Sequence, residues 1–189
     1  MKILALATDA FGGFGGIARA NRDLFEAIGK QHEVDILPRH AKESEIGPLP
    51  LNVTQSKPFP GRVGYAAHAF YKMLVRPEVD VIFCGHLFMV PLAWILSKIF
   101  AKPVWLQLCG IEAWDKPSRA IQRVVKDAHL VTAISRYTRR SQHDRRRVHP
   151  VVEAKTQRSP DHGSRHTGRE VATNERIPAA LLWHATLAA

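Results

Sequence analysis

The sequence predicts an α/β protein with a doubly wound, mostly parallel, Rossmann-like sheet over residues 1–139. Short apolar runs that suit strands buried on both faces alternate with segments of helical periodicity. The first of these strands leads through a glycine-rich turn directly into a helix, as in nucleotide-binding folds of this class. The chain has 189 residues and is 46% apolar, which is enough for the core of one such domain.

The first 28 residues predict a strand, a glycine loop and a helix. Residues 2–8 form an apolar run, residues 12–16 contain four glycines, and the segment that follows has an apolar helical face. The N–H groups in the first turn of a helix lack intrahelical partners and carry partial positive charge. We therefore predict that this loop binds an anion, with phosphate as the first candidate. The alternative is that the glycines only let the strand and the helix pack closely. The expected apolar face comprises Ile17, Ala20, Leu24, Ala27 and Ile28.

The remainder of residues 1–139 continues the alternation of strands and helices. Residues 39–61, which include four prolines, are expected to be a loop. The helix over 88–101 is apolar enough to be buried, and Ser118 and Ser135 can cap the helices that follow them. The strand over residues 2–8 is expected at the centre of the sheet. The other predicted strands cover 33–37, 79–84, 103–108 and 129–134, and the other helices cover 62–76, 88–101 and 118–127.

Ligands of parallel sheets bind beyond the carboxyl ends of the strands, so the residues at these ends are the candidates for a site. His86 follows a strand and a glycine, where it can face a ligand or cap the next helix. Cys84, His86 and Cys109 could come together at neighbouring strand ends. They lack a fourth ligand and the short spacing of zinc sites, so no metal is expected.

Three segments at these strand ends resemble the N-terminal domain of family 4 glycosyltransferases, which have the GT-B fold. They are Gly15–Arg19 in the glycine loop, Cys109–Trp114 in the turn after the strand predicted over 103–108, and Val131–Arg139 near the end of the domain. The resemblance implies that a sugar is transferred from a nucleotide-sugar donor to a glycan or lipid-linked acceptor, in the synthesis of cell-surface polysaccharide or glycolipid. The donor is a substrate, and no cofactor is implied.

The resemblance also implies roles for individual residues. Gly15 and Gly16 would face the donor phosphate. His86, Glu112 and Trp114 would bind the acceptor, the tryptophan by stacking on a sugar ring. Cys109 occupies the position at which the family has a catalytic histidine, and a thiol is a weaker base at neutral pH.

The match ends near residue 139. Residues 140–173 are rich in Arg, His, Ser, Thr and Pro and lack apolar periodicity, and residues 177–189 are too few for a domain. We expect residues 140–189 to be a disordered basic tail, with a frameshift as one hypothesis for its origin. The family's donor-binding pair of glutamates has no counterpart in the sequence, so we expect the chain alone to bind an acceptor without transferring sugar.

The net charge of +10 and the pI of about 10.1 indicate anionic partners. Residues 139–189 carry ten Lys or Arg and five Asp or Glu, hence half of that charge, which suits peripheral binding to an anionic membrane. Nucleic acid is not expected, because Trp183 is the one aromatic residue there. Two cysteines without a C-x-x-C motif and a longest apolar run of 14 residues (87–100) predict a cytoplasmic protein, with the inner membrane face as a site of association.

A dinucleotide-binding oxidoreductase is the first alternative, because Gly13–Ala18 fits G-x-G-x-x-A and Asp35 follows about 20 residues later. The acid that binds ribose should end the second strand, whereas Asp35 is followed by two further apolar residues and is expected inside it. A binding module without catalytic activity is the second alternative.

Overall fold

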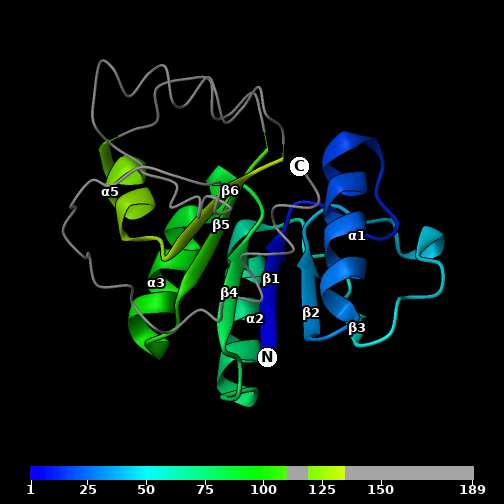
Figure 1. Cartoon of the computed structure of the whole chain (residues 1–189), viewed down its shortest axis with the longest axis horizontal. Helices are drawn as coiled ribbons and strands as arrows, with labels where there is room; N and C mark the ends of the chain where they lie inside the picture. Colours follow the sequence, from blue (N-terminus) through cyan, green and yellow to red (C-terminus); the bar gives the residue numbers. More distant parts are fainter. Residues whose placement is uncertain (110–118, 135–189) are drawn as a thin grey trace, which may run out of the picture.

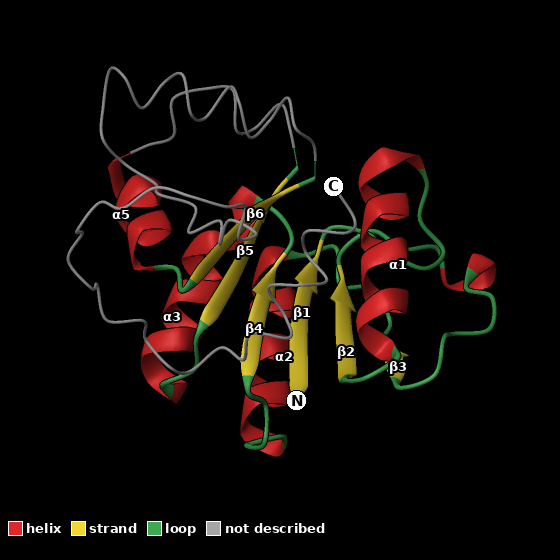
Figure 2. Ribbon diagram, viewed as in Figure 1, coloured by secondary structure: helices red, strands yellow, loops and turns green. Residues whose placement is uncertain are grey.

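The computed structural model describes residues 1–109 and 119–134. They form one six-stranded, entirely parallel sheet in the order β3-β2-β1-β4-β5-β6, with helices on both faces (Figures 1 and 2). The predicted Rossmann-like class is confirmed, and β1 lies inside the sheet. The predictions for the tail and for the caps Ser118 and Ser135 lie outside the described residues. The strands are β1 (Lys2–Ala7), β2 (Glu33–Pro38), β3 (Val53–Gln55), β4 (Val81–Cys84), β5 (Val104–Leu108) and β6 (Leu130–Ala133).

The helices divide the core into two layers. Alternate residues of β1 point to opposite faces, so Ile3 and Ala5 pack toward α1 while Leu4 and Leu6 pack toward α2 and α3. The side of α2 and α3 also carries α5, whose Val125 packs against the same cluster. The helices are α1 (Gly15–Gly29), α2 (Arg62–Val75), α3 (Val90–Phe100) and α5 (Arg119–Asp127), with short 3-10 turns η1 (Glu43–Glu45) and η2 (Leu87–Met89).

The strand order reverses between β1 and β4. From β1 the chain moves outward through β2 to β3, and β4, on the other side of β1, leads outward through β5 to β6. Ligands of open α/β sheets bind at such a reversal, beyond the carboxyl ends of the strands. The glycine loop follows β1 and Gly85–His86 follows β4, so both segments flank this point.

Three expectations are corrected by the structure. Residues 39–61 are not all loop, because Val53–Gln55 forms the edge strand β3 against β2. The helix predicted over 88–101 is not fully buried, since α3 covers the sheet on one side and leaves Ile95 and Ile99 41% and 61% exposed. The buried stripe of α1 is also rotated relative to the prediction, and it comprises Ala18, Asn21, Leu24, Phe25, Ile28 and Gly29.

Candidate ligand-binding edge of the sheet

The loop between β1 and α1 is held by hydrogen bonds to its main chain. Each of its carbonyl groups from Asp9 to Gly13 accepts a hydrogen bond from another part of the domain. The negative ends of these peptide dipoles are therefore engaged by the protein, and the bonds restrain the conformation of the loop. The donors and distances are Asn21 Nδ2 to Asp9 O (2.7 Å), Arg22 Nη1 to Ala10 O (3.0 Å) and Gly13 O (2.7 Å), Gln55 Nε2 to Phe11 O (2.8 Å), and Lys42 N to Gly12 O (3.1 Å).

Two buried amides connect this loop to the middle of the sheet. Gln107 of β5 donates from Nε2 to Asn21 Oδ1 at 3.3 Å, and Asn21 in turn holds the carbonyl of Asp9. Both amide side chains are buried, so their bonds to each other replace lost hydration. The sequence analysis missed both, although a polar residue within an apolar helical stripe or a buried strand is the signal that could have found them.

The four glycines of the loop have different surroundings. A Cβ atom at Gly12, whose φ is +79°, would lie 2.5 Å from Lys42 O, and one at Gly13 would overlap the Asp9 carboxylate. For these two residues the close-packing interpretation is correct. Gly15 and Gly16 differ, because, apart from their chain neighbours and the backbone of α1, no atom of the described residues lies within 4 Å of a Cβ built on either. Gly15 needs its freedom for φ of +90°, whereas Gly16 faces open space in an ordinary conformation.

The start of α1 has no side-chain cap. Phe14 occupies the N-cap position without a side-chain hydrogen bond, and the first turn contains no acidic residue. Asp9 is the acid nearest in sequence, and burial raises the pKa of its carboxyl. The Lys42 ammonium lies 5.3 Å from the centre of the Phe14 ring. An uncapped helix start beside bare backbone is suited to receive an anion.

The ends of β4 and β5 lie side by side. His86 is buried and caps η2, its Nδ1 accepting from Phe88 N at 3.3 Å while its ring stacks on Phe88 at 4.7 Å. Of the two roles considered for His86, the structure shows the helix cap. Cys109 donates from Sγ to Gly85 O at 3.0 Å, so the structure brings Cys109 and the Gly85–His86 segment together. Glu112 and Trp114, the other predicted acceptor-binding residues, lie outside the described residues.

The Cys84 thiol is fully buried beneath this edge. Its Sγ donates to His86 O at 3.3 Å, and burial raises the pKa of the thiol to about 12, so it stays protonated at neutral pH. Over residues 1–109 and 119–134, no group of three or more His, Cys, Asp or Glu side chains is placed to hold a metal ion.

Asp35 lies inside β2, as expected, and its carboxylate contacts two cations. Lys72 Nζ of α2 lies 2.9 and 3.2 Å from the two carboxylate oxygens, and Arg76 Nη1 lies 3.4 Å from Oδ2. With 5% of its surface exposed, Asp35 is a core ion-pair residue and is not available to a ribose at the carboxyl edge. This removes the acid on which the dinucleotide alternative depends.

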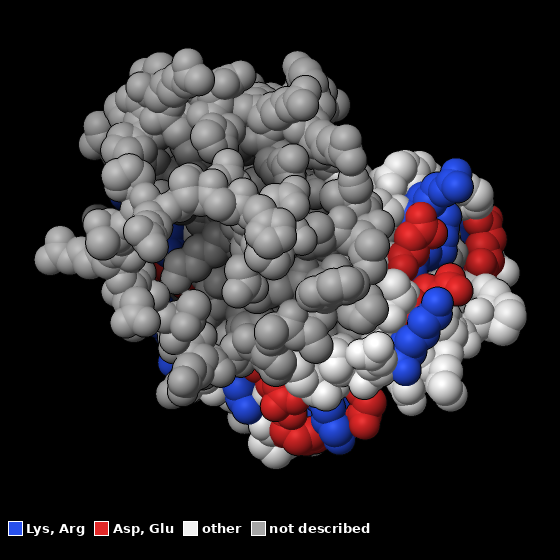
Figure 3. All heavy atoms as spheres, viewed as in Figure 1, with Lys and Arg blue, Asp and Glu red and all other residues white. Residues whose placement is uncertain are grey.

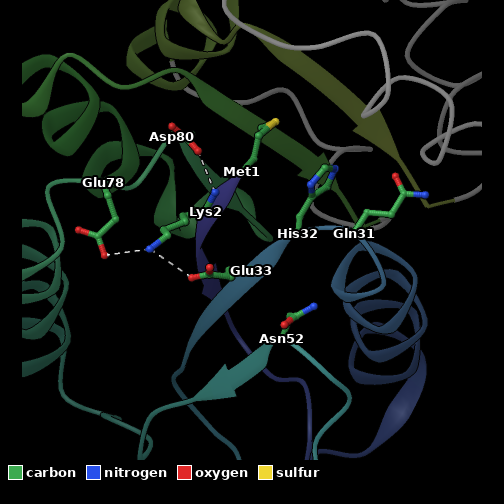
Figure 4. Close-up of a pocket in the computed structure, with 8 residues that line it drawn as sticks. All are labelled: Met1, Lys2, Gln31, His32, Glu33, Asn52, Glu78 and Asp80. Atoms are coloured by element: carbon green, nitrogen blue, oxygen red, sulfur yellow. Dashed lines mark hydrogen bonds and ion pairs between the residues drawn. The ribbon is translucent and has the colours of Figure 1, made fainter.

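A concavity of about 310 Å³ lies at the opposite, amino edge of the sheet (Figure 4). Its charged side chains have partners within the domain: Lys2 Nζ lies 3.4 Å from Glu33 and 3.6 Å from Glu78, and the Asp80 carboxylate accepts from the backbone N–H of Lys2 at 2.8 Å. This pocket is distant from the glycine loop, and its paired charges do not indicate a ligand. It is lined by Met1, Lys2, Gln31, His32, Glu33, Asn52, Glu78 and Asp80.

These features define the chain as an α/β protein of the Rossmann-like class, with a preformed loop at the point where strand order reverses. No protein-family model and no curated protein matches the sequence. Among solved structures, HepE (Alr3699) of Anabaena in complex with UDP-glucose matches with a TM-score of 0.50 and 22% identity, over 76% of this chain and 40% of that one. Its complexes with UDP, and with UDP and glucose, both give a TM-score of 0.49, at 22% and 23% identity.

The lipopolysaccharide outer core galactosyltransferase WaaB, in its apo form, matches with a TM-score of 0.48 and 15% identity, over 77% of this chain and 42% of that one. The chain spans about two fifths of the length of these solved structures. The match to the UDP-glucose complex of HepE supports the Rossmann-like fold of this chain. Membership of family 4 remains a prediction.

Proposed function

We propose that the chain is the acceptor-side part of a family 4 glycosyltransferase, which transfers sugar from a nucleotide sugar to a glycan or lipid-linked acceptor. The observation that carries the proposal is the open backbone at Gly15 and Gly16, at the start of a helix without a side-chain cap. The three sequence segments described above support it. The fold shared with HepE, whose solved structure contains UDP-glucose, is consistent with it.

In this proposal each segment of the carboxyl edge has a role. The first-turn N–H groups of α1 bind the diphosphate of the donor, because the loop carbonyls are engaged elsewhere and the helix dipole favours negative charge. Cys109 stands at the position of the family's histidine, next to Gly85, and His86, Glu112 and Trp114 contact the acceptor. Transfer itself also needs the donor-binding domain that the resemblance implies.

NMR titration of the chain with UDP-glucose, with pyrophosphate and with uridine tests the proposal. We expect amide shifts at residues 15–18 with the first two ligands and none with uridine. Gly16→Val should abolish them, because the valine side chain fills the open space above the helix start. Gly61→Val is the matched control, since Gly61 is the N-cap residue of α2 and, like Gly16, has no described atom near its Cβ position. Shifts that persist in Gly16→Val, or an absence of shifts in the wild type, would contradict a phosphate site here.

A further inference from the structure

The side chain of Arg39 is a cation held at the carboxyl edge of the sheet. Arg39 follows β2, and its backbone N–H donates to Ala7 O at 3.1 Å and to Thr8 O at 3.2 Å, which fixes it beside the end of β1. Leu37, two residues earlier, packs in the core layer of α2, so the Arg39 side chain leaves the sheet on that same face. Its Nη2 donates to Pro60 O at 2.9 Å, just before α2 begins.

The charge of this guanidinium is not neutralised by the described residues. On the face drawn in Figure 3, Lys and Arg lie among Asp and Glu. By contrast, no Asp or Glu in the described part of the chain lies within ion-pair distance of Arg39. Glu43 and Glu45, the acids that follow it in sequence, pair with Lys57 and Lys42. A cation that has left the solvent in part normally has a counter-charge.

The donors of Arg39 are also incompletely used. Its Nε is buried and has no acceptor among the described residues, and within the same residues Nη1 makes no hydrogen bond. Buried donors are nearly always satisfied, so an exception points to a ligand, an ion or water at that place. The planar guanidinium is suited to hold two oxygens of one anion.

The start of α2 adjoins this guanidinium. Pro60, whose carbonyl group binds Arg39, immediately precedes the N-cap residue Gly61. No described side chain caps α2, its first turn contains no acid, and the Cβ position of Gly61 faces open space. The free N–H groups of this turn and the guanidinium therefore favour negative charge at one place. Burial raises the pKa of Tyr65 of α2, and the charge of Arg39 opposes this shift, which indicates that the two groups are close.

We propose that Arg39 and the start of α2 bind a phosphate group of the acceptor, on the opposite face of the sheet from the glycine loop. A phosphate has three oxygens and up to two charges, which the guanidinium and the helix start can share, whereas a carboxylate has two oxygens and one charge. The anion site is argued from Arg39 itself. Its assignment to the acceptor rests on the sugar-transfer proposal.

The phosphate can belong to a soluble sugar phosphate or to a lipid-linked acceptor. No helix in the described part of the chain is long and apolar enough to cross a bilayer. The test is NMR titration of the full chain with glucose 6-phosphate, with butyl phosphate and with glucose. We expect both phosphates to shift the amides of residues 61–64 and the Nε–H signal of Arg39, and glucose to shift neither. Tighter binding of glucose 6-phosphate would assign the site to a sugar phosphate, and tighter binding of butyl phosphate to a lipid-linked acceptor.

Arg39→Gln should weaken phosphate binding at these signals at least tenfold, because a charge and its donors are lost. Arg39→Lys keeps the charge without the planar fork and should weaken binding less. Lys30→Gln is the matched control, since it removes one charge at the other end of α1, away from the carboxyl edge. Circular dichroism checks the fold of each variant. If Arg39→Gln does not fold, the Arg39 Nε–H signal of the wild type decides.

The glycine loop and this site can fail separately. Gly61→Val should abolish the shifts at residues 61–64 and leave those at residues 15–18, and Gly16→Val should do the reverse, so that each variant is the control of the other. Loss of the shifts at residues 15–18 alone would contradict the donor site and leave this one. A wild type in which phosphate shifts neither residues 61–64 nor the Arg39 Nε–H would overturn the proposal, as would a folded Arg39→Gln that binds phosphate like the wild type.

Discussion

The side-chain amide of Gln55 makes two hydrogen bonds to the main chain of Phe11, 44 residues away in sequence. Its Nε2 donates to Phe11 O at 2.8 Å, and its Oε1 accepts from Phe11 N at 3.2 Å. In this way the short edge strand β3 holds the glycine loop that follows β1. The loop is therefore fixed from the edge of the sheet by Gln55 and from α1 by Asn21 and Arg22.

Gln55→Ala should destabilise the domain by about 1–2 kcal/mol, because two part-buried main-chain groups of Phe11 lose their partners. Gln55→Glu should cost at least as much, since its carboxylate can accept from Phe11 N but places a second acceptor oxygen against Phe11 O. Urea unfolding gives the free energies, and hydrogen exchange at the Phe11 amide gives the local effect. Ser56→Ala is the matched control. A Gln55→Ala variant as stable as this control would show that the two hydrogen bonds between Gln55 and Phe11 contribute nothing to stability.

Two glycines of the loop should respond in opposite ways to alanine. Gly12→Ala should lose about 2 kcal/mol or more of unfolding free energy, because φ is +79° and the new methyl would meet Lys42 O. Gly16→Ala should be neutral or stabilising by up to about 1 kcal/mol, since Gly16 lies within a helix and faces open space. Thermal or urea unfolding of both variants decides this, and equal losses at the two sites would contradict the distinction.

Lys72→Met should destabilise the domain by about 3 kcal/mol, because the carboxylate of Asp35 would keep only the longer contact to Arg76 and the hydrogen bond from Thr54 Oγ1 at 3.3 Å. Replacing both partners, as in Asp35→Leu/Lys72→Met, should recover much of that loss. Lys57→Met serves as the control, since its ion pair with Glu43 is exposed. Urea unfolding of the wild type, the two single variants Asp35→Leu and Lys72→Met, and the double variant measures the coupling. Additive losses would show that the pair acts as two independent residues.

His68 should make stability depend on pH in the mildly acidic range. Its ring stacks on Phe59 at 4.5 Å, and burial, with the nearby charge of Lys72, lowers the pKa of His68 below its usual 6.5. The unfolded chain then takes up a proton more readily than the native one, so stability falls as the pH drops below about 6.5. His68→Phe should remove this loss. Unfolding free energies near pH 7.5 and pH 5.5 test it, and the same pH dependence in both proteins would exclude His68 as its source.

The 189-residue chain by itself should not turn over a nucleotide sugar. In the function proposed above, alignment of donor and acceptor across two domains accounts for about 7–11 kcal/mol of barrier lowering, and the chain covers 40% of the HepE structure that it matches. A transfer assay with UDP- and GDP-sugars and lipid or oligosaccharide acceptors measures it. Turnover that Gly16→Val or Glu112→Ala abolishes would place a complete site within these residues.

The sequence by itself determined the class of the fold and the edge of the sheet, at the carboxyl ends of the strands, where a ligand is expected. Apolar runs such as residues 2–7 and 104–108 are local patterns, and a run with no polar face has to be buried on both sides, which predicts a parallel sheet between helices. The same reasoning placed Asp35 inside β2, because two apolar residues follow it. Glycines that lie between a strand and a helix are likewise recognised from the local sequence.

Only the tertiary structure decided which groups hold that edge together. Strand β3 has three residues and exists because it pairs with the open edge of β2, a contact that no local pattern encodes. Gln55 and Gln107 reach the loop region from strands distant in sequence, and the exposure of Ile99 depends on what α3 packs against. Hydrogen bonds and burial are properties of neighbours in space, whereas periodicity reports only neighbours along the chain. For that reason the four loop glycines, alike in sequence, divide into two that are packed and two that are open.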